Sequence, residues 1–338
     1  MTELTVAAGL ARGLMELAAA KGADRAELSR RGGIDPRTLD DQDVRVPFAS
    51  YVALMRAGKE LCRDPALALH YGESNDLAQI SIVGLLGYAC ETMGQAFAQL
   101  NRYGRLVVEF DGPRERFRGE RRPDGFWVVD TRENPNDFPE LSESTFARMV
   151  CGPRHFGVAQ VARSVRFTHE PPAYRAEYDR IFQAPVAFGC EENALLIDQA
   201  CMTHRIALQP RYVFGILSEH ADALLKTLEA SKTTRGRVES LLMPALHTGE
   251  ANVDGIAAAM GMSRQTLFRR LKSEGVTFAA VLEGLRRQLA LHYLRGRKVS
   301  VNETAYLVGF SDPAAFSRAF KRWTGASPRE VRQSADVP

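Results

Sequence analysis

Residues 261–272, GMSRQTLFRRLK, and residues 309–321, GFSDPAAFSRAFK, are two versions of one pattern. Each stretch begins with a glycine, continues with a residue that caps helices, and then places two apolar residues four positions apart. A glycine that ends one helix, followed by a capped amphipathic helix, is the arrangement of a helix-turn-helix unit. The two stretches therefore predict two such units in the last quarter of the chain.

The residues around the first stretch indicate where its helices begin. Asn252 is placed to cap the helix before the turn, and Ser263 is placed to cap the helix after it. Thr277 can then cap a longer helix over about 278–294, which Gly296 closes. This longer helix would join the first unit to the second.

The second unit repeats the first with one inserted residue in its turn. Ser300 and Glu303 have the spacing of a capping box, and Asp312 can cap a helix whose first residue is Pro313. The matching pairs are Gly261/Gly309, Ser263/Ser311, Leu267/Phe316, Arg269/Arg318, Leu271/Phe320 and Lys272/Lys321. An internal repeat of 48 to 49 residues with this many matches indicates a duplicated structural unit.

The faces opposite the apolar pairs carry side chains that suit DNA. Gln265 can pair with adenine, Arg269 with guanine, and Phe268 can contact a thymine methyl, unless Phe268 belongs to the core. The second unit is poorer in such groups, so we expect the first unit to read more bases directly. The expected base contacts are Gln265, Phe268, Arg269, Ala314, Ser317 and Arg318, and the expected phosphate contacts are Arg264, Thr266, Lys272 and Lys321.

Charge is unevenly distributed along the 338 residues, whose formal net charge is +3. Residues 252–338 hold 14 Lys+Arg against 7 Asp+Glu, a net charge of +7, and the remainder of the chain is mildly acidic. A basic segment at one end is typical of a nucleic-acid footprint, although a solvated basic surface would give the same count.

These motifs support a resemblance to a known family. GMSRQTLFRRLKSEG (261–275) and GFSDPAAFSRAFKRWTGASPREVR (309–332) resemble the two helix-turn-helix units of AraC/XylS-type bacterial transcription regulators. The resemblance implies that each unit places its second helix in the major groove of double-stranded DNA. The connecting helix would then separate the two helices by about one turn of DNA, roughly 34 Å. It further implies a cytoplasmic activator that pairs as a homodimer and acts with RNA polymerase.

The first two hundred residues read as an α+β sensing domain. We expect helices over 4–20, 47–62, 91–105 and 141–157 and an antiparallel meander over 105–132. We also expect a strand over about 165–170, ended by Pro171 and Pro172, and two further strands within 185–197. The stretch RSVRFTHEPPAYRAEYDRIFQAPVAFGCEENALLID (163–198) resembles the arabinose-binding-type effector domain of one AraC subfamily. That resemblance implies a small-molecule effector, with amino acids and hydrophobic carboxylates among the classes of ligand.

The expected domains are an effector and dimerisation domain over 1–208, a linker helix over 209–235 and an all-α DNA-binding domain over 236–338. The helix-turn-helix units are expected over 252–273 and 300–323. Within the linker, one apolar seam is spaced for a short dimer interface or for docking on its own domain. The seam consists of Val213, Leu217, Ala221, Leu224 and Leu228.

No motif identifies the effector pocket. Its ligand-binding residues stay unknown, although some aromatic and histidine side chains are candidates that also suit core or surface positions. These candidates are Tyr88, Tyr103, Phe126, Trp127, His155, Phe156 and His169.

Other function classes find little support in the sequence. The chain contains no HExxH, P-loop, GxSxG or GxGxxG motif, so neither an enzyme nor a cofactor is expected. Cys201 and His204 form a lone pair, which does not make a metal site. The five cysteines are scattered and odd in number, which is typical of a reducing compartment, and no apolar run is long enough for a membrane span. Control by a protein partner or a permanently active dimer remains an alternative to a small-molecule effector.

Overall fold

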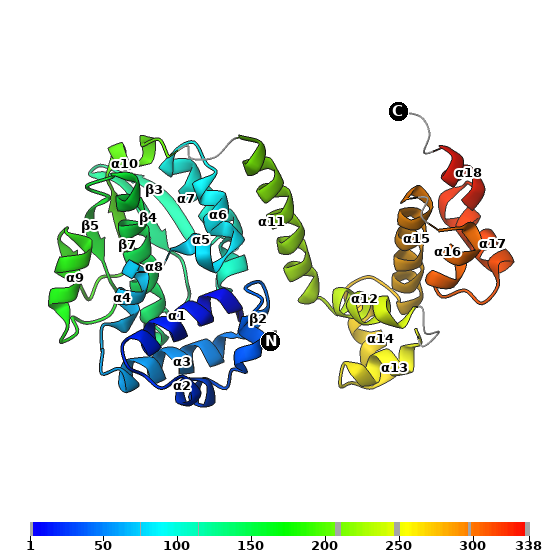
Figure 1. Cartoon of the computed structure of the whole chain (residues 1–338), viewed down its shortest axis with the longest axis horizontal. Helices are drawn as coiled ribbons and strands as arrows, with labels where there is room; N and C mark the ends of the chain where they lie inside the picture. Colours follow the sequence, from blue (N-terminus) through cyan, green and yellow to red (C-terminus); the bar gives the residue numbers. More distant parts are fainter. Residues whose placement is uncertain are drawn as a thin grey trace. The chain divides into compact units, whose positions relative to one another are not determined.

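The computed structural model divides the chain into two compact units, one ending at Leu225 and one beginning at Lys226 (Figure 1). It describes residues 3–74, 76–113, 115–206, 211–246, 251–296 and 299–334. The expected domain boundary at residue 208 lies outside these residues. No helix in the described ranges is both long enough and apolar enough to cross a lipid bilayer.

The first unit combines a helical layer with a mixed sheet. Its helices are α1 (Ala8–Ala20), α2 (Arg25–Gly32), η1 (Pro36–Leu39), α3 (Phe48–Leu61), α4 (Leu67–Ser74), α5 (Leu77–Ile80), α6 (Ile82–Tyr88), α7 (Met93–Val107), η2 (Pro135–Asp137), α8 (Glu140–Cys151), η3 (Gly152–Phe156), α9 (Arg175–Phe182) and α10 (Gln199–Thr203). The helix α11 (Arg211–Ser231) begins in this unit and ends in the second.

The main sheet has the strand order β3-β4-β7-β5-β6. These strands are β3 (Phe117–Arg122), β4 (Gly125–Asp130), β5 (Ala162–Arg166), β6 (Val186–Ala187) and β7 (Ala194–Ile197). All pairs are antiparallel except β5 with β6, which run parallel. A separate two-stranded ribbon joins β1 (Thr5–Ala7) to β2 (Arg45–Pro47). The expected α+β class is therefore confirmed for the first unit.

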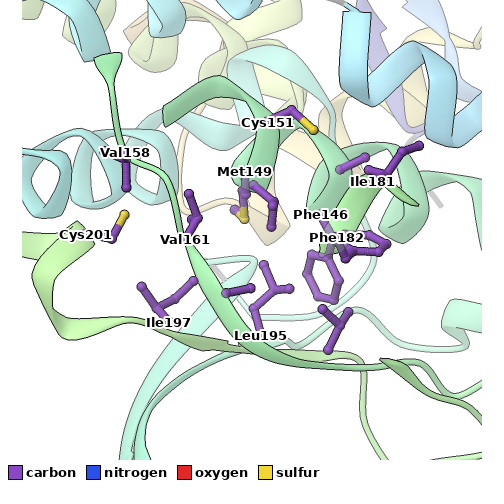
Figure 2. Close-up of a cluster of buried hydrophobic side chains, with 14 of the residues drawn as sticks. Phe146, Met149, Cys151, Val158, Val161, Ile181, Phe182, Leu195, Ile197 and Cys201 are labelled. Atoms are coloured by element: carbon purple, nitrogen blue, oxygen red, sulfur yellow. The ribbon is translucent and has the colours of Figure 1, made fainter. Parts of the chain in front are cut away.

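Helix α8 lies at the centre of this unit, between the sheet and the helical layer. Its Phe146 and Met149 pack with Leu195 and Ile197 of β7 in the main apolar core (Figure 2). On its other side α8 lies close to α4. The distance is so short that a Cβ added at Gly72 of α4 would lie 2.2 Å from the backbone oxygen of Ser144 of α8. The absence of a side chain at Gly72 therefore allows the two helices to approach.

The expected antiparallel meander over 105–132 is wrong at its start. Only the β3–β4 hairpin forms, and Val107 still belongs to α7. Tyr103, Leu106 and Val107 are buried along one side of that helix, so tertiary packing continues the helix into a stretch rich in residues that favour strands. Val108 then forms a single antiparallel bridge with Val6.

The second unit is entirely helical in its described residues, as expected. Its helices are α12 (Thr234–Ala245), α13 (Val253–Ala259), α14 (Arg264–Ser273), α15 (Phe278–Gly296), α16 (Val301–Leu307), α17 (Pro313–Thr324) and α18 (Pro328–Ser334). They form two apolar cores, one built around Leu267 and Leu271 and the other around Phe316 and Phe320. Leu289 of α15 packs against both cores, so this helix connects them.

The helix starts follow the capping residues expected from the sequence. The side chains of Asn252 and Ser263 accept from the backbone N–H groups of Gly255 and Thr266. Ser300 and Glu303 form the reciprocal capping box, in which the Ser300 side chain accepts from the Glu303 backbone N–H. The Asp312 carboxylate likewise accepts from two backbone N–H groups at the start of α17. Each cap thus gives one or two of the orphan N–H groups at its helix start a partner.

The apolar seam of α11 packs on its own domain in the first unit. Ala221 is fully buried, and Phe214 packs against the main core of that unit. The neighbouring Asp222 accepts hydrogen bonds from Arg102 at 2.9 Å and from the Tyr103 hydroxyl at 2.8 Å, both on α7. Of the two interpretations of the seam, docking on its own domain therefore holds for this part of the helix.

Candidate nucleic-acid interface and ligand cavity

The second helix of each helix-turn-helix unit buries its apolar pair and exposes the opposite face. In α14, Leu267 and Leu271 are fully buried, whereas Gln265, Arg269 and Lys272 are exposed. These three exposed side chains make no hydrogen bond with any described residue, so they are available to a partner. Their amide, guanidinium and ammonium groups are the types that read base edges and phosphates.

Phe268 and Arg264 lie next to this group on the same helix. Phe268 is 42% exposed, which excludes the alternative that it belongs to the core. The Arg264 guanidinium lies 5.3 Å from the Phe268 ring centre and 3.4 Å from the Asp254 carboxylate on α13. Thr266 is half-buried, with its hydroxyl 3.0 Å from that of the capping Ser263.

In α17 the same division recurs with smaller side chains. Phe316 and Phe320 are fully buried, and Ala314, Arg318 and Lys321 are exposed. The remaining expected contact, Ser317, is half-buried and donates its hydroxyl hydrogen to the carbonyl of Pro313 at 2.9 Å. Its hydroxyl hydrogen is thus engaged within the helix, and the base contact expected of it stays a prediction.

One partly buried contact fixes the turn of the second helix-turn-helix against α15. Arg286 of α15 donates from Nη2 to the carbonyl of Gly309 at 3.0 Å, and its guanidinium lies 4.8 Å from the Phe310 ring centre. Arg322 of α17 adds an ion pair of 2.6 Å with Glu283 of α15. The connecting helix α15 therefore holds the second helix-turn-helix through these side chains as well as through their shared apolar core.

The first domain contains a partly open cavity of about 150 Å³, lined by helices α1, α3 to α8 and η3 and by strand β3. Apolar side chains such as Phe97, Leu100 and Val107 of α7 form most of its wall. Tyr88, His155 and Phe156, three of the candidates from the sequence, line it. The other four, Tyr103, Phe126, Trp127 and His169, do not line this cavity.

Two polar side chains that sequence reasoning missed also line the cavity. Arg148 of α8 has its Nε and Nη2 shielded from solvent with no hydrogen-bond partner, and its guanidinium lies 5.2 Å from the Tyr71 ring centre. Tyr51 of α3 is 1% exposed, and its hydroxyl also lacks a partner. Burial raises the pKa of Tyr51, while the nearby charges of Arg148 and Arg116 act in the opposite direction. Because both side chains sit within ordinary helical patterns, no local sequence signal marks them.

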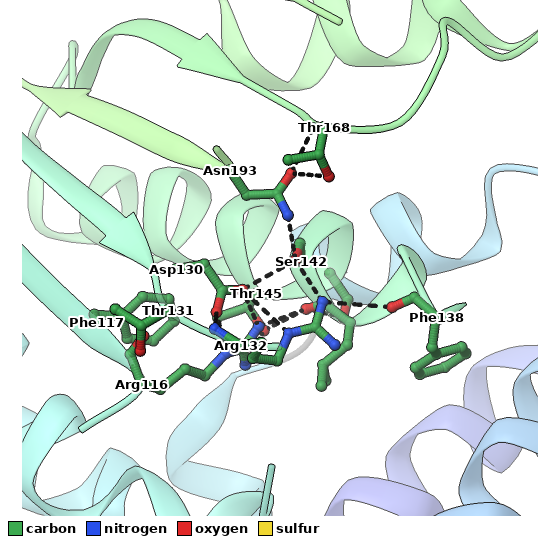
Figure 3. A network of polar contacts seen from close by, with 12 residues as sticks. Arg116, Phe117, Asp130, Thr131, Arg132, Phe138, Ser142, Thr145, Thr168 and Asn193 are labelled. Carbon is green, nitrogen blue, oxygen red and sulfur yellow. Dashed lines mark hydrogen bonds and ion pairs between the residues drawn. The ribbon is translucent and has the colours of Figure 1, made fainter. Parts of the chain in front are cut away.

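Arg116, the second arginine in the cavity wall, belongs to a buried ion network (Figure 3). Its Nη2 lies 2.9 Å from the carboxylate of Asp130, which also contacts Arg132 at 3.3 Å. Burial acts to raise the pKa of Asp130, but the charges of Arg116 and Arg132 outweigh it and hold the pKa below its usual range. Ser142 donates to the same carboxylate at 3.0 Å, so this network is satisfied within the unit.

The cysteines are not arranged for catalysis. All five thiols are free, and burial raises the pKa of Cys90 and Cys201 to about 11. A thiol with a raised pKa holds less thiolate at neutral pH and is a poorer nucleophile. Across the described ranges, no three His, Cys, Asp or Glu side chains are grouped so that they could hold a metal ion.

Comparisons with known proteins agree with this geometry. The family model described as "Arabinose-binding domain of AraC transcription regulator, N-term" matches residues 22–206, and a model described as "Helix-turn-helix domain" matches residues 256–334. The chain belongs to the AraC family of transcription regulators. It is therefore a DNA-binding regulator with an effector-type first domain and not an enzyme.

Relatives of this AraC-family regulator match it along almost its whole length. The ornithine utilization regulator of Pseudomonas aeruginosa is 28% identical over 337 residues, covering 96% of this chain and 95% of the relative. The transcriptional regulator VirS of Mycobacterium tuberculosis is 26% identical, with the same shares of each chain. The crystal structure of the regulator CdpR from Pseudomonas aeruginosa covers 95% of this chain and 97% of its own, at 22% identity and a TM-score of 0.43.

Proposed function

We propose that this regulator is a ligand-responsive activator whose two helix-turn-helix units read two successive major grooves of promoter DNA. The observation that carries the proposal is the pair of capped helices α14 and α17, each with a buried apolar pair and an exposed basic face. The longer side chains of α14 supply most of the direct readout, and the smaller side chains of α17 supply less of it.

The proposed contacts divide into two classes that respond differently to mutation. Arg269 pairs with guanine, Gln265 with adenine and Phe268 with a thymine methyl, so these side chains determine sequence. Ala314, Ser317 and Arg318 make the base contacts of the second helix-turn-helix. Arg264, Thr266, Lys272 and Lys321 contact phosphate, which adds affinity without determining sequence.

The test is a comparison of two variants on a cognate and a scrambled DNA duplex. Arg269→Ala is expected to cost about 1–3 kcal/mol on the cognate duplex and to relax the preference at one base pair. Lys321→Ala is expected to weaken binding to both duplexes alike and to reduce the slope of affinity against salt by about one unit. Equal losses on both duplexes for Arg269→Ala would reject its assignment as a base contact.

The regulatory part of the proposal rests on the cavity in the first unit. A ligand there changes DNA binding or pairing only if it binds one state of the protein more tightly than the other. We propose that the active state is a cytoplasmic homodimer that acts with RNA polymerase. Sedimentation of the full chain with and without an effector, followed by transcription in vitro, tests both points.

A further inference from the structure

We infer that the cavity of the first unit binds a small apolar monocarboxylate, whose carboxylate pairs with Arg148 and accepts a hydrogen bond from Tyr51. The inference rests on the proposed ligand-responsive function, which it deepens by naming the class of ligand. Two side chains of the cavity wall, Arg148 and Tyr51, have buried polar atoms without a hydrogen-bond partner, whereas the other charged groups of the wall are paired.

Arg148 is a cation with no acid within ion-pairing distance among the described residues. Its Nε and Nη2 are shielded from solvent and donate to no acceptor, although a guanidinium normally satisfies these two donors together. An unpaired donor of a charged group shielded from water is costly. A carboxylate matches this pair of donors because its two oxygens have the spacing of the guanidinium fork.

The other charged side chains of the wall already have partners. Arg116 is paired with Asp130 at 2.9 Å, and Glu73 receives two hydrogen bonds from Arg180, at 2.7 and 2.6 Å. Asp76 accepts from the backbone N–H of Ala78 at 2.9 Å, at the start of α5. An ammonium group of an amino acid would therefore have to share Glu73 with the Arg180 guanidinium and Asp76 with the backbone of α5.

Tyr51 supplies the second unpaired group. Its hydroxyl is buried without a partner, and it lies close enough to Arg148 for that charge to act on its pKa. Because Tyr51 and Arg148 line the same cavity, this phenol hydroxyl offers one more donor to an anion bound there. Together the two side chains present several donors, and only the Tyr51 oxygen can also accept a hydrogen bond. An excess of donors over acceptors suits a carboxylate better than an ammonium group.

The size and polarity of the cavity limit the rest of the ligand. A cavity of about 150 Å³ is comparable to one that accommodates benzene, so it has room for an apolar part of about six carbon atoms or a few more. The wall around it is formed by Phe97, Leu100, Met93 and Val107, which offer no hydrogen bonds from their side chains. Phenylacetate and hexanoate fit this description.

The test is isothermal calorimetry on the full chain with phenylacetate and hexanoate as probes. The neutral isostere phenylacetamide tests the need for charge, and L-ornithine and L-arabinose represent the competing classes. We expect both carboxylates to bind and phenylacetamide to bind at least about tenfold more weakly. Binding of ornithine or arabinose without either carboxylate, or no binding of either carboxylate to the folded chain, would overturn the inference.

Two cavity variants and one control locate the site. Arg148→Met is expected to weaken phenylacetate binding at least about tenfold and to raise the melting temperature of the unliganded chain, because it removes an unpaired charge. A merely structural role for Arg148 predicts a lower melting temperature instead. Tyr51→Phe keeps the ring and removes one donor, so a smaller loss of affinity is expected. The control Arg56→Met makes the same arginine-to-methionine change at an exposed position of α3, and we expect it to leave the affinity for phenylacetate unaltered.

Transcription measured on the same variants separates this inference from the proposed function. If phenylacetate binds through Arg148 but does not change DNA binding or transcription, the ligand inference stands and the ligand-responsive function fails. If another effector activates the protein and Arg148→Met responds to it as the parent chain does, the function stands and the ligand inference fails.

Discussion

The glycines in the two turns are expected to respond unequally to the same substitution. Gly261 has a φ of +66°, and a Cβ added there would meet no atom within 4 Å. Gly309 has a φ of +78°, but its Cβ would lie 2.8 Å from the backbone oxygen of Leu246 and 3.3 Å from Nη2 of Arg286. Both alanines incur the left-handed backbone cost of about 1–2 kcal/mol. Only Gly309→Ala must also displace a backbone carbonyl, which adds about 1–3 kcal/mol by analogy with overpacked cores.

We therefore expect the free energy of unfolding of the second unit to fall by about 1–2 kcal/mol for Gly261→Ala and by about 2–5 kcal/mol for Gly309→Ala. Urea unfolding of the full chain measures this when Trp127→Phe leaves Trp323 as the single tryptophan, located in the second unit. Gly22→Ala, a left-handed glycine of the first unit with open space around it, is the control and should leave the Trp323 transition in place. Equal losses at Gly261 and Gly309 would refute the role of the Leu246 carbonyl.

Three further substitutions test other parts of the structure. Burial raises the pKa of Glu143, so ionisation of this carboxyl favours the unfolded chain as the pH rises above about 4.5. Glu143→Gln should therefore raise the melting temperature at pH 7, with a gain that vanishes near pH 4, and a gain independent of pH would contradict this reasoning. Ser300→Ala should cost about 1 kcal/mol in urea unfolding, with the exposed neighbour Asn302→Ala as its control. Phe320→Ala should cost about 3–5 kcal/mol, whereas the adjacent Lys321→Ala should change stability by less than about 0.5 kcal/mol.

The helix-turn-helix region could be predicted closely because its information is local. A cap such as Ser263 or Ser300 acts on a backbone N–H three residues away, so the short stretch that contains it is enough to place the start of the helix. The exposed faces follow from the same stretch, since Leu267 and Leu271 fix the side of α14 that is buried. The exposure of Gln265 and Arg269 follows in turn, although their contacts with DNA stay predictions.

The cavity could not be predicted because its chemistry depends on partners that are distant in sequence. Arg148 matters through the absence of an acid near it, and α4, α3 and β3 must be in place before that absence exists. The prediction of a strand at the start of the meander was wrong for a related reason. Residues 107–110, Val-Val-Glu-Phe, are rich in residues that favour strands, but Val107 is buried as the last residue of α7.

Because α15 contributes to both apolar cores, its length sets the rotation of the second helix-turn-helix relative to the first. One residue inserted between Leu285 and Ala290 would rotate everything after it by about 100° and advance it by about 1.5 Å. Leu289 could then no longer pack against both cores. If the two units read successive grooves as proposed, α17 would also meet the double helix out of phase with α14. Substitutions on the exposed side of α15 leave this relative rotation unaltered. A single insertion changes it, and we expect binding to weaken at every DNA site, whatever its sequence.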